Sequence, residues 1–152
     1  MSEAKMAEIF TSHGERILID DEDFDRVSCS TWSLDLAGYP RARIDTEDVR
    51  LHRFVIGAND GQHVDHKNGD LLDARKANLR ICTHAENMRN RKVSVSNKCG
   101  LKGVSKDRNR WRALIYFNGR KFSLGTFDSP EAAHAKYREA AQKLHGEFAR
   151  FA

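Results

Sequence analysis

The pattern over residues 110–127 constrains the fold more than any other part of this sequence. Apolar and polar residues alternate through Arg110–Phe117, as in a strand with one buried face. Asn118-Gly119 then supplies the two-residue turn typical of a tight hairpin. The sequence therefore predicts a second strand over residues 121–127, and residues 102–106 are expected to add a third.

A helix is expected directly after this hairpin. Ser129 suits the N-cap, Pro130 the first helical position and Glu131 the first turn. Apolar residues at helical spacing, several of them small alanines, predict a helix that lies close against the sheet and ends at Gly146. The apolar stripe consists of Ala133, Tyr137, Ala140, Ala141 and Leu144, and we interpret Tyr137 and Trp111 as core residues rather than ligand contacts.

The first 60 residues predict a small antiparallel sheet and a short helix. Ile17-Leu18-Ile19 opens a strand, residues 38–40 form a turn, and residues 41–44 alternate like a strand. Residues 16–45 are therefore interpreted as one small sheet. A short helix is expected over residues 49–56.

Residues 63–87 predict two strands, a long intervening loop and a helix. The strands are expected at 63–66 and 79–83, with a turn at Asn68-Gly69-Asp70. Thr83 and Glu86 have the spacing of a capping box, which places a helix from His84 to about residue 91. This order brings Asp65, His66 and Asn87 near one another.

Charge is distributed very unevenly. The net charge of +4 combines 12 acidic and 6 basic residues in positions 1–50 with 11 basic residues and 1 acidic residue in positions 89–121. Any single base has a solvated surface as its simplest explanation. A basic run interleaved with Trp111, Tyr116 and Phe117 favours a polyanionic partner.

Several classes of protein are disfavoured by the composition. No apolar run approaches the ~20 residues that a membrane span needs, and the N-terminus lacks the features of a signal peptide. Cys29, Cys82 and Cys99 form no C-x-x-C pair, so no structural zinc and no disulfide framework are expected. We expect reduced cysteines, a cytoplasmic protein, no membrane partner and no small-molecule substrate.

The types of residue in the 63–87 segment suit hydrolysis. Oxygen atoms of Asp65 and an asparagine suit a hard divalent cation, and His66 beside them suits proton abstraction from water. Taken singly, these residues have simpler explanations: a surface Asp-His pair, a turn residue at Asn78 and an exposed helix residue at Asn87. A hydrolytic site followed by a basic surface predicts an enzyme that cuts nucleic acid.

The chain also resembles two known families. Residues 16–92 resemble the phage-type HNH endonucleases, a group often carried by mobile introns, and residues 99–151 resemble the AP2-type DNA-binding domain. The first resemblance is carried by Leu51-His52-Arg53, Val64-Asp65-His66-Lys67-Asn68-Gly69-Asp70, Asn78-Leu79-Arg80-Ile81-Cys82-Thr83 and Glu86-Asn87. The second is carried by Gly103-Val104, Trp111-Arg112-Ala113, Leu124-Gly125-Thr126-Phe127, Glu131-Ala132-Ala133 and His145-Gly146-Glu147-Phe148-Ala149.

The HNH resemblance implies a role for each of four residues. Asp65 would ligate the metal, His66 would be the general base, and Asn78 would brace the loop and orient His66. Asn87 occupies the last position of an H-N-N variant, where many relatives carry a second His, and would be the second metal ligand. With two protein ligands Mg²⁺ is favoured, and Mn²⁺ should substitute. The sequence leaves open whether His52 acts near the site or packs in the core, and whether His84 rather than Asn87 completes the metal shell.

The AP2 resemblance implies a sheet that lies in the major groove of DNA. Ser105 and Ser123 stand where plant relatives often use Arg and Trp, so the target sequence of those relatives does not carry over. The candidate DNA-binding residues are Arg89, Arg91, Lys102, Lys106, Arg108, Arg110, Arg112, Tyr116, Lys121 and Ser123.

These observations combine into one hypothesis. The expected fold is α+β: a small antiparallel sheet and a ββα-metal nuclease motif, followed by a three-stranded antiparallel sheet packed on one helix. The domains are a nuclease over 1–92 with its ββα-metal core at about 62–91, a linker over 93–101 and a DNA-binding domain over 102–152. The expected function is metal-dependent, site-preferring, homing-endonuclease-like cleavage of double-stranded DNA by a monomer or weak dimer. The alternatives are a DNA-binding regulator with a vestigial nuclease fold and an RNA-directed nuclease.

Overall fold

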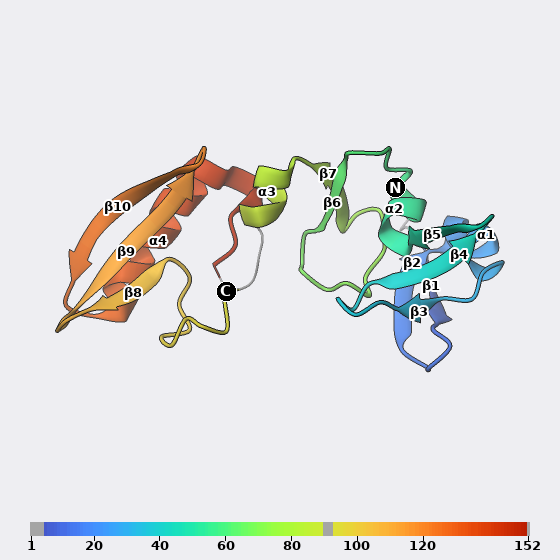
Figure 1. Ribbon diagram of the computed structural model, residues 1–152, viewed down its shortest axis with the longest axis horizontal. Coiled ribbons are helices and arrows are strands. Elements are labelled where there is room, and N and C mark those ends of the chain that lie inside the picture. Colours follow the sequence, from blue (N-terminus) through green and yellow to red (C-terminus); the bar gives the residue numbers. More distant parts are fainter. Residues whose placement is uncertain (1–4, 90–92, 152) are drawn as a thin grey trace. The chain divides into compact units, whose positions relative to one another are not determined.

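The computed structural model describes residues 5–89 and 93–151. The chain divides into two compact units, Met1–His84 and Ala85–Ala152. Both are built from helices and small antiparallel sheets, which confirms the expected fold class (Figure 1). The domain boundary predicted after residue 92 remains a prediction.

The first unit begins with two separate small sheets. The elements are β1 (Met6–Phe10), β2 (Arg16–Asp20), the short helices η1 (Asp21–Asp23) and α1 (Phe24–Ser28), β3 (Ser33–Leu34), β4 (Pro40–Ile44), β5 (Glu47–Arg50) and α2 (Leu51–Ile56). Strands β1 and β2 pair with each other, and β4 is the central strand between β3 and β5.

Two expectations for this region were wrong. Residues 16–45 contribute to two sheets rather than one, because β2 pairs with the unforeseen β1 and not with β4. The helix starts at Leu51 and not at residue 49, because Glu47–Arg50 pairs with β4 as strand β5. In both cases a partner distant in sequence determined the structure.

The core of the first unit gathers residues from both sheets and from α2. Trp32 is 2% exposed, and its indole nitrogen donates a hydrogen bond of 2.8 Å to the carbonyl oxygen of Val27. A buried indole N–H needs such a partner. The buried apolar residues around it include Ile9, Ile17, Ile19, Ala42, Leu51, Val55, Val64, Ala74 and Leu79.

The predicted strand, loop, strand, helix order follows α2. Strands β6 (His63–His66) and β7 (Leu79–Cys82) form an antiparallel pair, and α3 (His84–Arg89) begins directly after Thr83. The division between the two units falls inside α3, after its first residue.

The second unit has the architecture that the sequence predicted. Strands β8 (Val104–Asp107), β9 (Arg110–Phe117) and β10 (Arg120–Phe127) form an antiparallel sheet in the order β10-β9-β8, followed by α4 (Pro130–His145) and η2 (Gly146–Phe148). Asn118 and Gly119 turn the β9–β10 hairpin with φ of 49° and 74°, and Ser129 caps α4 by accepting a hydrogen bond from the Ala132 amide.

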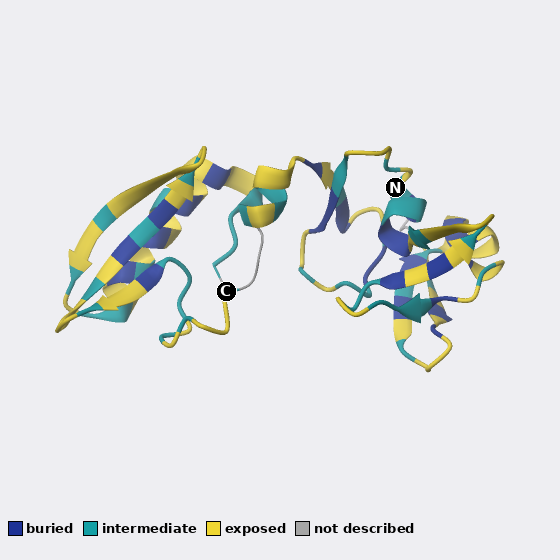
Figure 2. Cartoon of the chain, viewed as in Figure 1, coloured by how far each residue is buried: buried dark blue, intermediate teal, exposed yellow. Residues whose placement is uncertain are grey.

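Helix α4 covers one face of this sheet. Its buried residues Ala133, Tyr137 and Ala141 follow one helical stripe, and Ala113 and Ile115 of β9 are buried opposite (Figure 2). Strand β10 carries a bulge between Ser123 and Gly125. The bulge shifts the alternation of β10 by one residue. The face of the sheet opposite α4 carries the exposed residues Ser105, Arg112, Tyr116 and Lys121, with Leu114 half-buried among them.

Two further findings concern the described residues. None of the helices in residues 5–89 and 93–151 is long and apolar enough to cross a bilayer. Cys29, Cys82 and Cys99 are unbridged, and Cys82 is buried, as expected for a small core residue.

Candidate functional site

Strands β6 and β7 place the two central residues of the predicted site. His66 ends β6 opposite Leu79, and Asp65 lies opposite Arg80. Asp65 and His66 are 6% and 3% exposed. A charged and a titratable side chain are thus held in a rigid, largely dehydrated strand pair, where electrostatic interactions are stronger than in water.

Arg80 is a site residue that the sequence reasoning missed. Its Nε and Nη2 donate hydrogen bonds of 2.9 and 2.7 Å to Oδ2 of Asp65. Both side chains are at most 10% exposed. The register of the two strands sets Arg80 directly across from Asp65, and alternation along the chain does not give that register.

Asn78 clamps the loop that joins the two strands. Its Nδ2 donates to the carbonyl oxygen of Asp73 at 2.8 Å, and its Oδ1 accepts from the backbone N–H of Asn68 at 3.0 Å. Its own carbonyl accepts from the Lys67 amide at 2.8 Å. The side chain therefore ties both arms of the loop to a point directly after His66.

A second set of hydrogen bonds holds the middle of the same loop. Arg75 donates Nε and Nη2 to the two oxygens of Asp73, each at 2.7 Å, and Asn68 Nδ2 donates to Asp73 at 2.9 Å. These bonds, with Arg75 as the main cause, hold the pKa of the Asp73 carboxyl below its usual value. The Asp73–Arg75 pair therefore holds the loop in one conformation.

Three aromatic rings meet at His66. The His52 ring lies 5.1 Å from the His66 ring, and the Tyr39 ring lies 5.0 Å from His52 and 6.0 Å from His66, measured between centroids. Burial lowers the pKa of His66 below its ordinary value, although Asp65, Asp70 and Asp73 act in the opposite direction. A neutral imidazole is the form that accepts a proton.

Asn87 and the flanking histidines occupy different surroundings. Asn87 lies half-buried on α3, in the second unit, and its membership of the site remains a proposal. His63 and His84 lie with their ring centroids 5.0 Å apart, His63 half-buried and His84 exposed.

The residues of the first unit are compatible with a divalent cation. A carboxylate has about four lone-pair positions, so Asp65 can receive Arg80 and still coordinate a metal. No cluster of three or more His, Cys, Asp or Glu side chains suited to a metal occurs among residues 5–89 and 93–151. A metal here would therefore have few protein ligands, and oxygen donors such as Asp65 fit Mg²⁺ or Mn²⁺ better than zinc.

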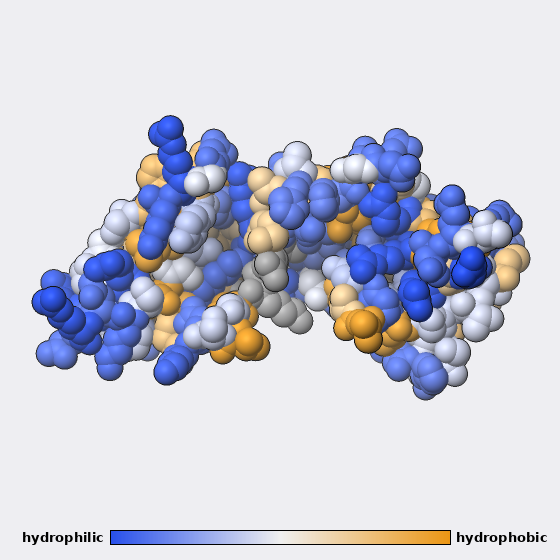
Figure 3. Space-filling model, in the orientation of Figure 1, coloured by the Kyte–Doolittle hydropathy of each residue, from blue (hydrophilic) through white to orange (hydrophobic). Residues whose placement is uncertain are grey.

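The exposed face of the β8–β10 sheet carries most of the predicted DNA contacts. The register sets Tyr116 beside Lys121 and Arg112 beside Ser105. Ion pairs hold two of the arginines: Arg112 pairs with Asp107, and Arg110 with Asp128 at 3.1 Å. Arg108 lies exposed in the β8–β9 turn, at an end of the sheet where hydrophilic residues gather (Figure 3). The exposed residues on or beside this face are Ser105, Arg108, Arg110, Arg112, Tyr116, Lys121 and Ser123.

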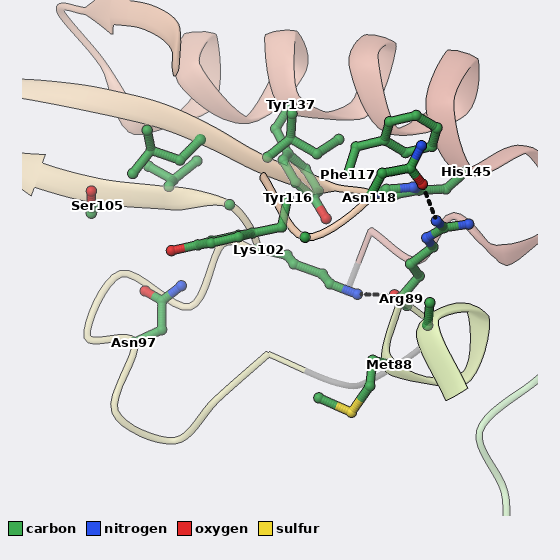
Figure 4. Close-up of a pocket in the computed structure, with 16 residues that line it drawn as sticks. Met88, Arg89, Asn97, Lys102, Ser105, Tyr116, Phe117, Asn118, Tyr137 and His145 are labelled. Atoms are coloured by element: carbon green, nitrogen blue, oxygen red, sulfur yellow. Dashed lines mark hydrogen bonds between the residues drawn. The ribbon is translucent and has the colours of Figure 1, made fainter. Parts of the chain in front are cut away.

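Three predicted DNA contacts of the described residues, Lys106, Lys102 and Arg89, lie elsewhere. Lys106 pairs with Trp111 in the register and extends over its ring at 5.8 Å, on the side that α4 covers. Lys102 and Arg89 line a cavity of about 570 Å³ in the second unit (Figure 4). Arg91 lies outside the described residues.

The cavity residues are linked by hydrogen bonds. Lys102 Nζ donates to the carbonyl oxygen of Arg89 at 2.6 Å, and Arg89 Nη2 donates to Asn118 at 3.5 Å. Burial, together with the nearby charge of Arg150, lowers the pKa of Lys102 to about 8. Lys102 is therefore partly withdrawn from the surface that would face a phosphate backbone.

Comparisons with known proteins assign different families to the two parts of the chain. Residues 53–89 match the family model described as HNH endonuclease, and residues 99–147 match the AP2 domain. Protein 3.8 of Escherichia phage T7 is 38% identical over 93 residues, which are 60% of this chain and 76% of the relative. An uncharacterized HNH endonuclease of Acanthamoeba polyphaga mimivirus is 33% identical over 129 residues, 81% of this chain and 67% of the relative. No solved structure matches the chain.

A nuclease motif followed by a DNA-binding sheet defines an endonuclease that acts on DNA. The chain belongs to the HNH endonuclease family and carries an AP2 domain after its nuclease segment.

Proposed function

We propose that this protein is a metal-dependent endonuclease that hydrolyses a phosphodiester in double-stranded DNA at preferred sites, as a homing endonuclease does. The observation that carries the proposal is the buried Asp65-His66 pair at the end of β6, with the following loop clamped by Asn78. A fixed acid–imidazole pair is what proton abstraction from water next to a phosphate requires.

Each residue has one role in this proposal. His66 accepts the proton of the attacking water, and Asn78 keeps the backbone after His66 in one conformation. Asp65, held by Arg80, and Asn87 would hold the divalent cation. When bound, the cation supplies positive charge that stabilises the developing phosphate charge and helps to orient the nucleophile.

The second unit supplies affinity for DNA in this proposal. Its exposed sheet face carries Arg110, Arg112 and Lys121 and would lie in the major groove, where arginines can bind guanine edges and lysines can contact phosphates. A single active site would nick one strand, so a double-strand break would need a dimer or two successive nicks. We further propose that the protein acts on DNA inside a bacterial or phage-infected cell.

The test is conversion of supercoiled plasmid to open circles with Mg²⁺, with Mn²⁺ and with EDTA. We expect nicking with either metal, none with EDTA, and a loss of at least ~100-fold in His66→Ala, which is the usual contribution of a general base. His13→Ala, an exposed histidine between β1 and β2, is the matched control and should nick normally.

The outcome separates the proposed function from its alternatives. Nicking by His66→Ala at the wild-type rate would remove His66 from the base role. Tight DNA binding by the wild type without cleavage in any metal would favour a regulator. Stronger competition by structured RNA than by duplex DNA would favour an RNA-directed nuclease.

A further inference from the structure

His52 is the exception on the buried face of α2. The neighbouring inward residues Leu51 and Val55 are apolar and 0% and 3% exposed, whereas the imidazole of His52 is 5% exposed. A leucine or phenylalanine would fill the same space without bringing polar atoms into the interior. The imidazole therefore needs an explanation beyond packing.

The Nδ1 atom of His52 has no hydrogen-bond partner among the described residues and is sealed from solvent. A buried polar atom left in this condition destabilises the folded state. Such atoms are uncommon in folded proteins, and a catalytic role is one of their recognised explanations.

The imidazole of His52 lies against the proposed general base. Its ring meets the His66 ring edge-on, with 5.1 Å between centroids and 69° between planes. Tyr39 closes the third side of the group, 5.0 Å from His52. With the centroids 5.1 Å apart, a nitrogen of each ring comes into hydrogen-bond range when both imidazoles turn toward each other.

The third ring is itself fixed in place. The guanidinium of Arg50 lies 4.4 Å over the Tyr39 ring, and Arg50 also pairs with Asp35 at 2.7 Å. The Tyr39 amide donates to Asp35 at 3.0 Å. Tyr39 is therefore held in place beside both His52 and His66.

His52 is held in its neutral form. Burial, with His66, Arg50 and Arg53 acting in the same direction, lowers the pKa of His52 to about 3. A neutral imidazole carries one donor and one acceptor nitrogen. It can therefore hydrogen-bond to a neighbouring imidazole without adding a second positive charge.

We infer that His52 is a positioning residue for the cleavage reaction. When DNA is bound, His52 forms a nitrogen-to-nitrogen hydrogen bond with His66. This bond fixes the orientation and the tautomer of His66, because the hydrogen bond at one imidazole nitrogen determines which nitrogen carries the proton. The inference rests on the proposed function of His66.

Two substitutions with opposite effects on stability test the inference. His52→Phe keeps an aromatic ring but removes both nitrogens, so it should be at least as stable as the wild type while single-turnover cleavage falls about 10–100-fold. His52→Asn leaves a cavity but keeps a polar nitrogen or oxygen near Nδ1. It should be less stable and yet cleave faster than His52→Phe. The dissociation constant for DNA, measured in EDTA, should be unchanged in both.

Val55→Ala is the matched control, because it removes buried volume from the next turn of α2 without touching the three rings. It should lower stability and leave the cleavage rate of the folded protein unchanged. If activity simply follows stability across the three variants, His52 is a packing residue and the inference is overturned.

Nitrogen NMR of the His66 ring tests the inference independently of cleavage. With a DNA duplex in EDTA, the wild type should show one tautomer of His66, and His52→Phe should show a mixture. One unchanged tautomer in both proteins would contradict the inference. If the wild type cleaves no DNA in any metal, the proposed function fails, and the tautomer result still decides the role of His52.

Discussion

At the scale of a residue, Gly103 shows how tightly the second unit is packed. Its φ is +74°, and a β-carbon at this position would overlap the ring atoms of Tyr137, which is buried under the sheet. A side chain at residue 103 would therefore meet both backbone strain and a steric clash.

We predict that Gly103→Ala destabilises the second unit much more than Gly119→Ala does. Gly119 has the same φ of +74° but open space around it, so Gly119→Ala measures the backbone cost alone, about 1–2 kcal/mol. The clash at residue 103 should add about 1–3 kcal/mol. Urea unfolding followed by the fluorescence of Trp111, with Trp32→Phe in every protein, measures both. Equal losses of unfolding free energy in Gly103→Ala and Gly119→Ala would show that the Tyr137 ring moves aside without cost.

At the scale of an element, the loop between β6 and β7 depends on one side chain. Asn78→Ala removes the hydrogen-bond partner of the Asp73 carbonyl, a buried contact that costs about 1–3 kcal/mol when it is lost, and that of the more exposed Asn68 amide, which costs less. We predict that the midpoint of urea unfolding falls. The fluorescence of Trp32, in a Trp111→Phe background, reports this unfolding. We also predict a loss of plasmid nicking, because His66 directly precedes the loop.

Asn59→Ala is the control for this loop. Asn59 is exposed in the turn after α2, and its substitution should change neither the midpoint nor the nicking rate. Full nicking by Asn78→Ala would show that the loop keeps its shape without the clamp.

The same loop should give the first unit a dependence on acid. Hydrogen bonds from Arg75 hold the pKa of the Asp73 carboxyl below its ordinary value, so the ionised form stabilises the fold. This stability is present above the unfolded pKa and is lost as pH falls through the lower folded pKa. We predict that stability followed at Trp32 declines below about pH 4, and that Asp73→Asn weakens this decline. An identical decline in Asp73→Asn would assign it to other carboxylates.

At the scale of the whole molecule, DNA binding should weaken steeply with salt. Each phosphate contact contributes a slope of about 0.9 in log affinity against log salt. We predict that Lys121→Gln, on the exposed sheet face, lowers this slope by about 0.9, the value for one phosphate contact. Fluorescence anisotropy of a labelled duplex, titrated at several salt concentrations, measures the slope. Lys143→Gln on α4, where Lys143 pairs with Glu139, removes the same charge and should leave the slope unchanged. Equal effects of the two substitutions would mean that the sheet face is not the docking surface.

Local patterns predicted most of the elements correctly. Alternation, the Asn118-Gly119 turn and the Ser129 cap identified β9, β10 and α4, because each of these signals acts between residues close in sequence. Strand β1 and the start of α2 were not predicted, since their structure depends on pairing with distant strands. The register with Trp111 sets Lys106 on the other face of β8 from Ser105, where it is exposed, and its contact with DNA stays a prediction.

The sequence by itself determined the family and the two kinds of unit, and it predicted the residues at the centre of the site, because motif spacing and residue chemistry are local properties. Only the tertiary structure decided what surrounds them. It placed Arg80 against Asp65 through strand register, and brought Tyr39 and His52 from separate elements to the ring of His66. Such contacts join segments that are distant in sequence and form when a shared core excludes water from both. The spacing of residues along the chain does not predict them.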